Sequence, residues 1–341
     1  MNPINGTKMY VGIDVSQAQL AVAVRVGSQR AHALGDYANS AAGFGQLASA
    51  LAAVCVQAGA TELHLVVEAT GGYEAALVAY AHQAGWLVSR VNAYHVRRWA
   101  SSQGRRGKSD PLDACVLADF GAINQVAAQH AMDEAAAQLE SLLRRRRDVE
   151  QLLRQESNRQ KQYGQRPHVP SAVHESLQRT LEALTQELAA LNQAIKELTA
   201  ASASLAQMVR ILLSMPGVGP KSVHYLLTLL YRFQAHTAGH GTAKQLTAYL
   251  GLDPQPYQSG SSVYRPASIS KMGDDYGRAL FFMATAGGVR GIIPSALSSL
   301  CARGKPYKVA IIACTRKLLT WAWALFHSQK PFDPSLHQIP S

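Results

Sequence analysis

The stretch Met9-Tyr10-Val11-Gly12-Ile13-Asp14 ends an apolar run with an acid, and Leu63-His64-Leu65-Val66-Val67-Glu68 repeats that arrangement further along the chain. Short apolar runs of this kind predict strands with buried faces. A half-buried carboxylate at the end of such a strand needs a partner, because an unpaired charge is costly to remove from water. We therefore expect a sheet in which two strands each end in an acid that must be satisfied by a cation or by hydrogen-bond donors.

A second pair of acids lies in Ser109-Asp110-Pro111-Leu112-Asp113, which predicts the start of a helix. Asp110 also suits an N-cap, and Asp113 would lie near the positive end of the helix dipole, so capping and metal binding are both open for this pair. Carboxylate oxygens suit hard cations such as Mg²⁺. Two such ions about 4 Å apart can activate an attacking oxygen and stabilise a leaving oxygen of a phosphodiester. The predicted metal ligands of this phosphoryl-transfer site are Asp14, Glu68, Asp110 and Asp113.

The segments around these acids predict an α/β unit with a mixed sheet. Two strands are expected within residues 9–26 and a third within 30–38, followed by an Ala-rich helix at 41–58. The remaining predicted elements are a strand at 62–68, a helix that follows the turn Thr70-Gly71-Gly72-Tyr73 and ends near 84, and a strand at 86–91. Antiparallel strands followed by alternation of strand and helix are the order expected of a ribonuclease H-like domain.

Residues 133–200 have a helical composition with a break at Gly164 to Pro170. The spacing predicts an antiparallel helical hairpin about 45 Å long at about 1.5 Å per residue. Its second helix carries a heptad seam, which can pair within the hairpin or with another subunit. The Arg144–Arg147 run in the first helix fits either a solvated face or a nucleic-acid contact. The seam residues are Leu177, Leu181, Leu184, Leu188, Leu191, Ile195 and Leu198.

The net charge of +11 is unevenly distributed. Residues 1–200 hold 19 Lys and Arg against 18 Asp and Glu, whereas residues 201–341 hold 14 against 4. A basic second part predicts a polyanionic partner, and nucleic acid is favoured because phosphate neutralisation supplies most non-specific affinity. A further basic stretch, interleaved with Tyr94, His95 and Trp99, is either a nucleic-acid contact or a solvated loop. Its cations are Arg90, Arg97, Arg98, Arg105, Arg106 and Lys108.

Two segments of the basic second part suggest contacts with phosphate. Leu213-Ser214-Met215-Pro216-Gly217-Val218-Gly219-Pro220-Lys221 resembles a helix-hairpin-helix, although a plain helix connection is also open. The loop Ser259-Gly260-Ser261-Ser262 is followed by further cations. A serine hydroxyl can attack a phosphodiester if cations stabilise the charge, but such a loop can also be a simple turn. The cations that accompany these segments are Lys221, Arg265, Lys271 and Arg278.

Other features bound the class of protein. The four cysteines show no metal-ligand spacing and indicate a reduced, cytoplasmic protein. The N-terminus lacks a secretory apolar core. The apolar stretch Val309 to Phe326 is broken by Arg316 and Lys317, which favours a buried helix over a membrane span. We therefore expect no membrane association.

Five motifs together resemble the DEDD transposases of insertion sequences, relatives of Piv-type DNA invertases. They are the GID strand end at Asp14, VEATG with Glu68, SDPLDA with Asp110 and Asp113, the MPGVG hairpin, and YQSGSS…SKMG with Ser259. They follow the family's order and span most of the chain. The choice of Ser259 over Ser261 or Ser262 rests on this resemblance alone.

The resemblance implies a RuvC-like ribonuclease H-fold domain (1–128), a coiled-coil helical hairpin (129–203) and a mostly α-helical transposase domain (204–341). It implies Mg²⁺-dependent exchange of donor and target DNA strands through a 5′-phosphoserine at Ser259. It also implies a structured guide (bridge) RNA and homodimers that join into homotetramers, in the bacterial cytoplasm and on the nucleoid. RNA-guided readout would leave the protein mainly backbone and shape contacts.

Three alternatives compete with this interpretation. The first is a ribonuclease H-fold nuclease or Holliday-junction resolvase that uses the same acids with water as the nucleophile. The second is a sugar kinase-like ATPase, suggested by the GIDVS stretch but disfavoured because no second phosphate loop follows. The third is a non-catalytic RNA-binding scaffold built on the helical hairpin. The serine and the basic second part of the chain favour the transposase.

Overall fold

A computed structural model of the chain describes residues 7–69, 71–105, 107, 109–259, 263–287 and 292–336, with side chains undescribed at 256–259, 263–267 and 292–294. The chain divides into two compact units. The first contains the residues up to Ala131 together with Ala235–Gly239, and the second contains Met132–Gln234 and the residues from His240 onward. The long helical hairpin thus belongs to the same unit as the C-terminal helices. The division into three domains stays a prediction.

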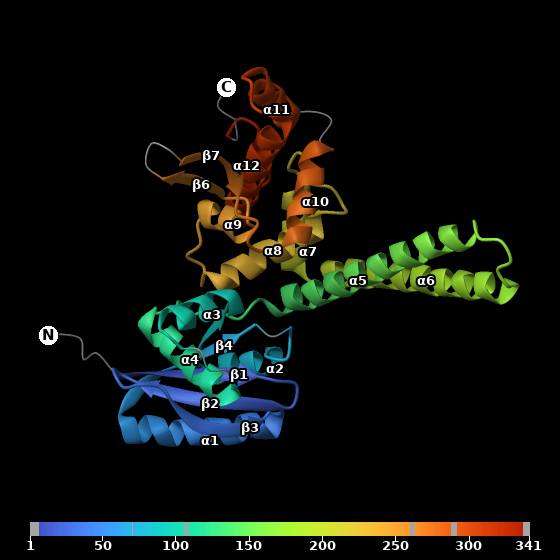
Figure 1. The fold of residues 1–341 in the computed structure, drawn as a ribbon. Helices are drawn as coiled ribbons and strands as arrows, with labels where there is room; N and C mark the ends of the chain where they lie inside the picture. The colour runs from blue at the N-terminus through green and yellow to red at the C-terminus, as the bar shows by residue number, and fades with distance from the viewer. Residues whose placement is uncertain are drawn as a thin grey trace. The chain divides into compact units, whose positions relative to one another are not determined.

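The first unit is built on a five-stranded sheet with the order β3-β2-β1-β4-β5 (Figure 1). The first three strands along the chain pair antiparallel, whereas β4 pairs parallel with both β1 and β5. This confirms the predicted mixed sheet, and each strand falls within about two residues of its predicted range. The strands are β1 (Thr7–Val15), β2 (Gln19–Val26), β3 (His32–Ala38), β4 (Ala60–Glu68) and β5 (Leu87–Val91).

The alternation of side chains along β1 divides the unit into two layers around the sheet. Met9, Val11 and Ile13 lie in one core cluster with Leu47 of α1 and Leu77 of α2. The residues between them face the opposite side of the sheet, because successive side chains of a strand alternate. That side is covered by α4 and α3. The helices are α1 (Ala41–Ala58), α2 (Ala75–Gln83), α3 (Ala93–Ser102) and α4 (Asp110–Ile123).

Helix α3 lies inside the basic stretch for which the sequence predicted no regular structure. Asn92 caps it by accepting a hydrogen bond from the Tyr94 amide. Val96 is buried beside Val66 and Leu117, so the helix has one apolar face. The interpretation of this stretch as a solvated loop is therefore wrong for residues 93–102, because one buried valine and a good cap suffice to dock a short helix.

The second unit begins with the helical hairpin, α5 (Glu134–Tyr163) and α6 (Ser171–Ala201), which pack along each other (Figure 1). Leu139, Leu143 and Val149 of α5 are buried, as are Leu177 and Ile195 of α6. The predicted hairpin and its break are confirmed, and α6 packs along α5. A coiled coil between subunits stays a prediction.

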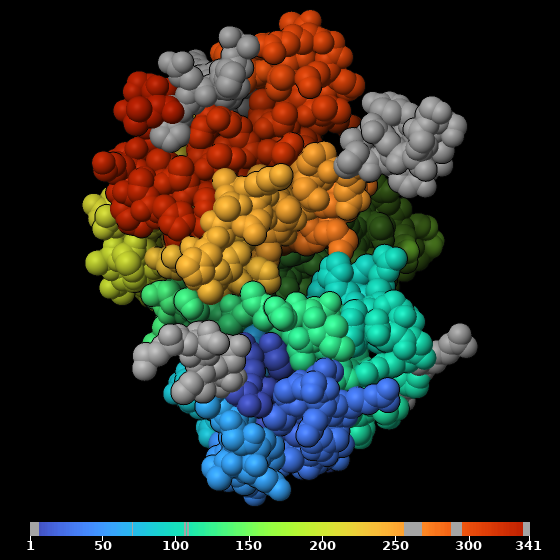
Figure 2. Space-filling view, turned by 90° about the vertical axis from the view of Figure 1, so that its left-hand side faces the viewer, coloured from blue at the N-terminus to red at the C-terminus, as the bar shows by residue number. Residues whose placement is uncertain are grey.

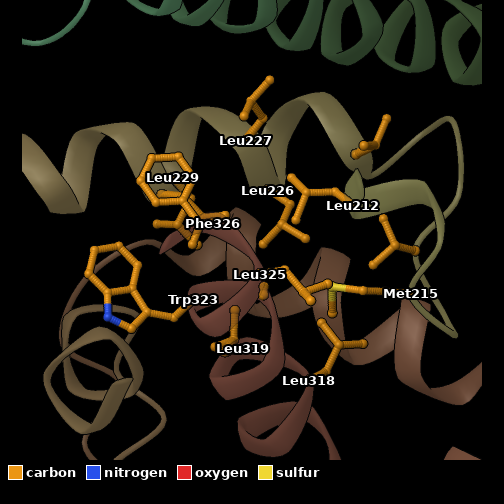
Figure 3. Packing of buried hydrophobic residues seen from close by; sticks show 14 of the residues in the cluster. Leu212, Met215, Leu226, Leu227, Leu229, Leu318, Leu319, Trp323, Leu325 and Phe326 are labelled. Carbon is orange, nitrogen blue, oxygen red and sulfur yellow. The ribbon is translucent and has the colours of Figure 1, made fainter. Parts of the chain in front are cut away.

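The rest of the second unit packs around α12, whose buried side chains meet those of α7 and α8 (Figure 3). Trp323 and Phe326 lie among the leucines of this core. The space-filling view shows the C-terminal segments, in orange to red, as closely packed (Figure 2). The elements are α7 (Ala203–Leu213), α8 (Val223–His236), α9 (Ala243–Tyr249), β6 (Pro254–Ser259), β7 (Val263–Ile269), α10 (Asp275–Ala286), α11 (Ile292–Ala302) and α12 (Tyr307–Ser328).

Two details of this unit bear on the sequence predictions. The stretch Val309 to Phe326 forms most of α12 and is largely buried, as predicted for a core helix. By length and composition alone α12 and α1 are both apolar enough to cross a membrane, but 61% of the α12 window is buried inside the protein. The predicted mostly helical region also contains a hairpin, β6–β7, which joins in antiparallel register from Pro254↔Ile269 to Ser259↔Val263.

Candidate active site

Asp14 and Glu68 lie at the same edge of the sheet. Strands β1 and β4 run parallel, and Ile13 pairs with Val67. Asp14 follows Ile13 and Glu68 follows Val67, so the two acids lie next to each other on neighbouring strands. Both acids face the side of the sheet that α4 covers, because Gly12 and Val66, two residues earlier on the same strands, lie under that helix. Parallel pairing thus brings together two acids that are far apart in the chain.

Helix α4 lies directly on β1 because Gly12 has no side chain. A Cβ at Gly12 would be 2.1 Å from the Ala114 carbonyl oxygen and 2.3 Å from the Ala118 amide nitrogen. Gly121 makes a similar approach, since a Cβ there would be 2.5 Å from a methyl group of Val66. These two contacts orient α4 so that its first turn lies toward the end of β1 that carries Asp14.

The first turn of α4 holds the other two acids. Ser109 is the N-cap residue and Asp110 is already helical, with the Asp113 amide donating to the Ser109 carbonyl at 2.8 Å. The interpretation of Asp110 as the N-cap is therefore wrong. Asp110 is exposed and Asp113 is half-buried. Both acids lie in the first turn of α4, where the helix dipole favours negative charge, so this role and metal binding are both compatible with their position.

The pKa of Asp14 indicates that the four acids lie near one another. Burial raises the pKa of Asp14 from its ordinary value of 3.8 to about 6, with further contributions from the charges of Asp110, Asp113 and Glu68. Charges act on a pKa in this way only at short range. The four carboxylates therefore form one repelling group at the edge of the sheet.

The residues present fit a divalent cation by their chemistry. All four donors are carboxylates, the ligands that hard cations such as Mg²⁺ prefer. A bound cation would relieve their mutual repulsion. Among the described residues no three or more His, Cys, Asp or Glu side chains form a ready-made ligand cluster. The acids are thus gathered at the site without being closed around a single point.

Ser259 belongs to the second unit, whereas the four acids belong to the first. It is the last residue of β6, opposite Val263 of β7, at the end of a hairpin. Its side chain, and all of Gly260, Ser261 and Ser262, lie outside the described residues. The role of Ser259 as nucleophile stays a prediction.

The predicted nucleic-acid residues have different surroundings. Arg97 and Arg98 are exposed on α3, and Arg98 donates to the Tyr94 hydroxyl at 3.0 Å with its guanidinium 5.5 Å from the Tyr94 ring centre. Arg105 instead donates to Asp119. Arg106 and Lys108 lie outside the described residues, as does the side chain of Arg265.

The cations of the second unit also differ among themselves. Lys221 and Lys271 are exposed, whereas Arg278 donates to the carbonyl oxygens of Leu250 and Gly273 at 3.3 and 3.1 Å. The MPGVG segment joins α7 to α8, with Gly217 at φ 83°, a left-handed conformation that suits glycine. Val218 and Met215 are buried beneath this turn.

Sequence reasoning missed a second charged cluster, formed by Asp119 of α4 with Arg25 and Arg105. Asp119 is only 2% exposed. A signal was available, because Asp119 stands between Ala118 and Phe120 in an otherwise apolar turn of α4. Arg25 similarly interrupts the apolar strand β2. Neither residue resembled a motif, so the pairing became visible only in the folded chain.

Comparison with known proteins identifies the family. Residues 11–163 match a family described as transposase, and residues 209–291 match the transposase IS116/IS110/IS902 family. A pilin gene-inverting protein of Moraxella lacunata is 30% identical over 279 residues, 81% of this chain and 84% of the relative. The chain belongs to the IS116/IS110/IS902 family of transposases. The first matched region of this transposase contains all four acids, and the second contains Ser259.

Two further proteins are similar to this transposase. The pilin gene-inverting protein of Moraxella bovis is 28% identical over 338 residues, which is 97% of this chain and 100% of the relative. T. thermophilus RuvC, solved in complex with a Holliday junction substrate, covers 36% of this chain and 98% of RuvC at 15% identity and a TM-score of 0.27.

Proposed function

We propose that this transposase cuts and rejoins DNA strands at the acidic site of the first unit, with Ser259 as the nucleophile. The observation that carries the proposal is the convergence of Asp14, Glu68, Asp110 and Asp113, supported by the raised pKa of Asp14. The strand order β3-β2-β1-β4-β5 and the position of α4 over β1 support a ribonuclease H-like, RuvC-like class for this unit. The similarity to two pilin gene-inverting proteins supports DNA as the substrate.

The four acids would hold Mg²⁺ against the scissile phosphate. When bound, the metal supplies Lewis-acid stabilisation of the negative charge that develops on phosphorus oxygens. The contribution of the chain is to position the carboxylates: β1 and β4 hold Asp14 and Glu68 side by side, and α4 brings two more acids over them. A raised pKa also means that Asp14 is partly protonated near pH 6 in the metal-free protein.

The chemical step is a balanced transesterification. The hydroxyl of Ser259 gives up its proton to solvent as its oxygen forms a bond to phosphorus, the bond from phosphorus to the 3′ oxygen breaks, and the 3′ oxygen takes up a proton. The product is a 5′-phosphoserine and a free 3′-hydroxyl, which preserves the phosphodiester energy. A 3′-hydroxyl of the partner strand then attacks the phosphoserine, reseals the DNA and returns the serine. No nucleotide cofactor is required.

The partners proposed here follow from charge and from the family. Donor and target DNA and a structured guide RNA would bind the basic surfaces. One contact would be the exposed Tyr94 ring with Arg98 beside it, together with exposed Arg97. The basic second part supports a polyanion that is bound through its backbone. We further propose a cytoplasmic homodimer that joins into a homotetramer, in which an acidic site and a serine meet across subunits.

Denaturing electrophoresis of the protein mixed with cognate DNA and RNA tests the proposal. Serine attack leaves a DNA-linked protein band that needs Mg²⁺, and this band disappears in Ser259→Ala. Ser261→Ala and Ser262→Ala are the matched controls and retain the band. DNA cleavage with no linked protein would instead favour a nuclease or resolvase that uses water. RNA binding without any cleavage, unaltered in Asp14→Ala, would favour a scaffold.

A further inference from the structure

Asp119 is a buried acid on the helix that carries two of the proposed metal ligands. It accepts hydrogen bonds from Arg25 at 2.6 Å, from Arg105 at 2.5 Å and from the Ala31 amide at 3.2 Å. Although burial raises the pKa of Asp119, the hydrogen bonds from Arg105, Arg25 and Ala31 hold it below its ordinary value. Asp119 is therefore an ionised, fully partnered carboxylate inside the first unit.

These bonds join four separate segments. Arg25 lies on β2, Ala31 lies in the β2–β3 connection, and Arg105 lies in the segment that leads into α4. Arg105 is held on a second side as well, since its guanidinium lies 5.7 Å from the centre of the Trp99 ring. Its amide also donates to the Ala100 carbonyl at 3.0 Å, which closes the end of α3.

The cluster completes the fixation of α4. Beside the close approaches at Gly12 and Gly121, the cluster ties α4 to β2 and to the β2–β3 connection. Asp119 follows Asp113 by about 9 Å along the helix axis at about 1.5 Å per residue, and points away from Asp110 at about 100° per residue. A charged anchor at that distance and direction sets the rotation of the first turn of α4.

Arg105 has a different environment from its basic neighbours. Its side chain is 36% exposed, and both its charge and its ring contact are used within the protein. Arg98 is exposed, and its hydrogen bond and ring contact among the described residues are both with Tyr94 of its own helix. The two arginines therefore differ in what they can offer to a phosphate.

We propose that Asp119 and Arg105 are a positioning pair, which sets where Asp110 and Asp113 stand relative to Asp14 and Glu68, and that Arg105 serves this pair and does not bind nucleic acid. The inference rests on the proposed metal site for its functional meaning. It replaces the sequence-based assignment of Arg105 to the nucleic-acid surface. Neither residue touches substrate or metal in this account.

The test compares Arg105→Ala, Arg105→Lys, Asp119→Asn and the double variant Arg105→Ala/Asp119→Asn in the full-length protein, with Arg98→Ala as the matched control. Three quantities are measured: Mg²⁺ affinity by calorimetry, affinity for a single-stranded oligonucleotide at several salt concentrations, and hydrogen exchange, without metal, of the Asp113 amide, which closes the first turn of α4 on the Ser109 carbonyl.

We expect Arg105→Ala and Asp119→Asn each to lower Mg²⁺ affinity about tenfold or more, as residues that support metal ligands do. The double variant should lose little beyond the worse single variant, because the pair acts as a unit. Arg105→Lys should recover part of the loss. Exchange of the first-turn amide should quicken in the single variants. Their affinity for the oligonucleotide should change by less than about twofold, and its salt dependence should not show the loss of a phosphate contact. Arg98→Ala should show the reverse, with a salt slope lower by about one.

Weaker oligonucleotide binding in Arg105→Ala, with unchanged Mg²⁺ affinity and unchanged exchange, would overturn the inference. If Asp119→Asn fails to fold, Arg105→Lys and Arg105→Ala still decide it through the exchange measurement. A wild-type protein that binds no Mg²⁺ would count against the metal site of the proposed function, and the metal-free exchange comparison would then decide the role of the pair alone.

Discussion

Replacement of Asp14 by asparagine should stabilise the metal-free protein at alkaline pH. The folded chain raises the pKa of Asp14 from 3.8 to about 6, first through burial and then through the charges of Asp110, Asp113 and Glu68. A tenfold change in an equilibrium is worth about 1.4 kcal/mol, so this rise corresponds to about 3 kcal/mol. Asp14 is only half-buried, and solvent screening reduces the figure to roughly 1–2 kcal/mol.

The sign of the pH dependence follows from linkage. A carboxyl group whose pKa is higher in the folded state stabilises the fold below its unfolded pKa, near 4, and loses that contribution as the pH rises through about 6. The asparagine variant does not titrate. Its advantage over the wild type should therefore be full at pH 8 and should shrink as the pH falls from about 6 toward 4.

Hydrogen exchange of the β1 amides in the presence of a chelator measures this effect in the first unit alone. A gain of roughly 1–2 kcal/mol slows exchange by about 5- to 30-fold at pH 8. Asp36→Asn, at an exposed position on β3, is the matched control and should leave β1 exchange unchanged. Equal exchange in Asp14→Asn and wild type at pH 8, or a gain of the same size at pH 4.5, would refute the raised pKa of Asp14.

Three further predictions concern the same unit. Gly12→Ala should lower the free energy of unfolding in urea by about 1–3 kcal/mol, because a Cβ there would be 2.1 Å from the Ala114 carbonyl oxygen. Gly45→Ala, in open space on α1, is the control and should be neutral or stabilising. Equal effects of the two substitutions would contradict the close approach of α4 to β1. Mg²⁺ at about 100 times its Kd should stabilise the wild-type first unit by about 2.7 kcal/mol in thermal unfolding, and Asp113→Asn should lose most of that gain. Burial lowers the pKa of His64 from 6.5 to about 4, so the free energy of unfolding should decrease as the pH falls through that window. His64→Phe should reduce this decrease, measured by urea unfolding at several pH values. An unchanged dependence on pH would exclude His64 as its cause.

Much of the first unit was predictable because its signals are local. The short apolar runs of β1 and β4 marked both strands and the acids at their ends. Helix α1 was predicted at 41–58 and lies at Ala41–Ala58. Helix α3 was missed, since one buried valine among cations leaves little periodicity to detect. The N-cap of α4 was placed one residue late, because Asp110 and Ser109 are both good capping types.

The sequence by itself determined which residues carry charge at the ends of strands, which stretches are long amphipathic helices, and which family the motifs resemble. Each of these follows from the order of side chains over a few turns or strand residues. The tertiary structure alone decided that β1 pairs parallel with β4, that α4 lies on Gly12, and that Arg105 pairs with Asp119 across fourteen residues. Such contacts depend on how whole helices and strands pack against one another, and no local pattern of side chains encodes that packing.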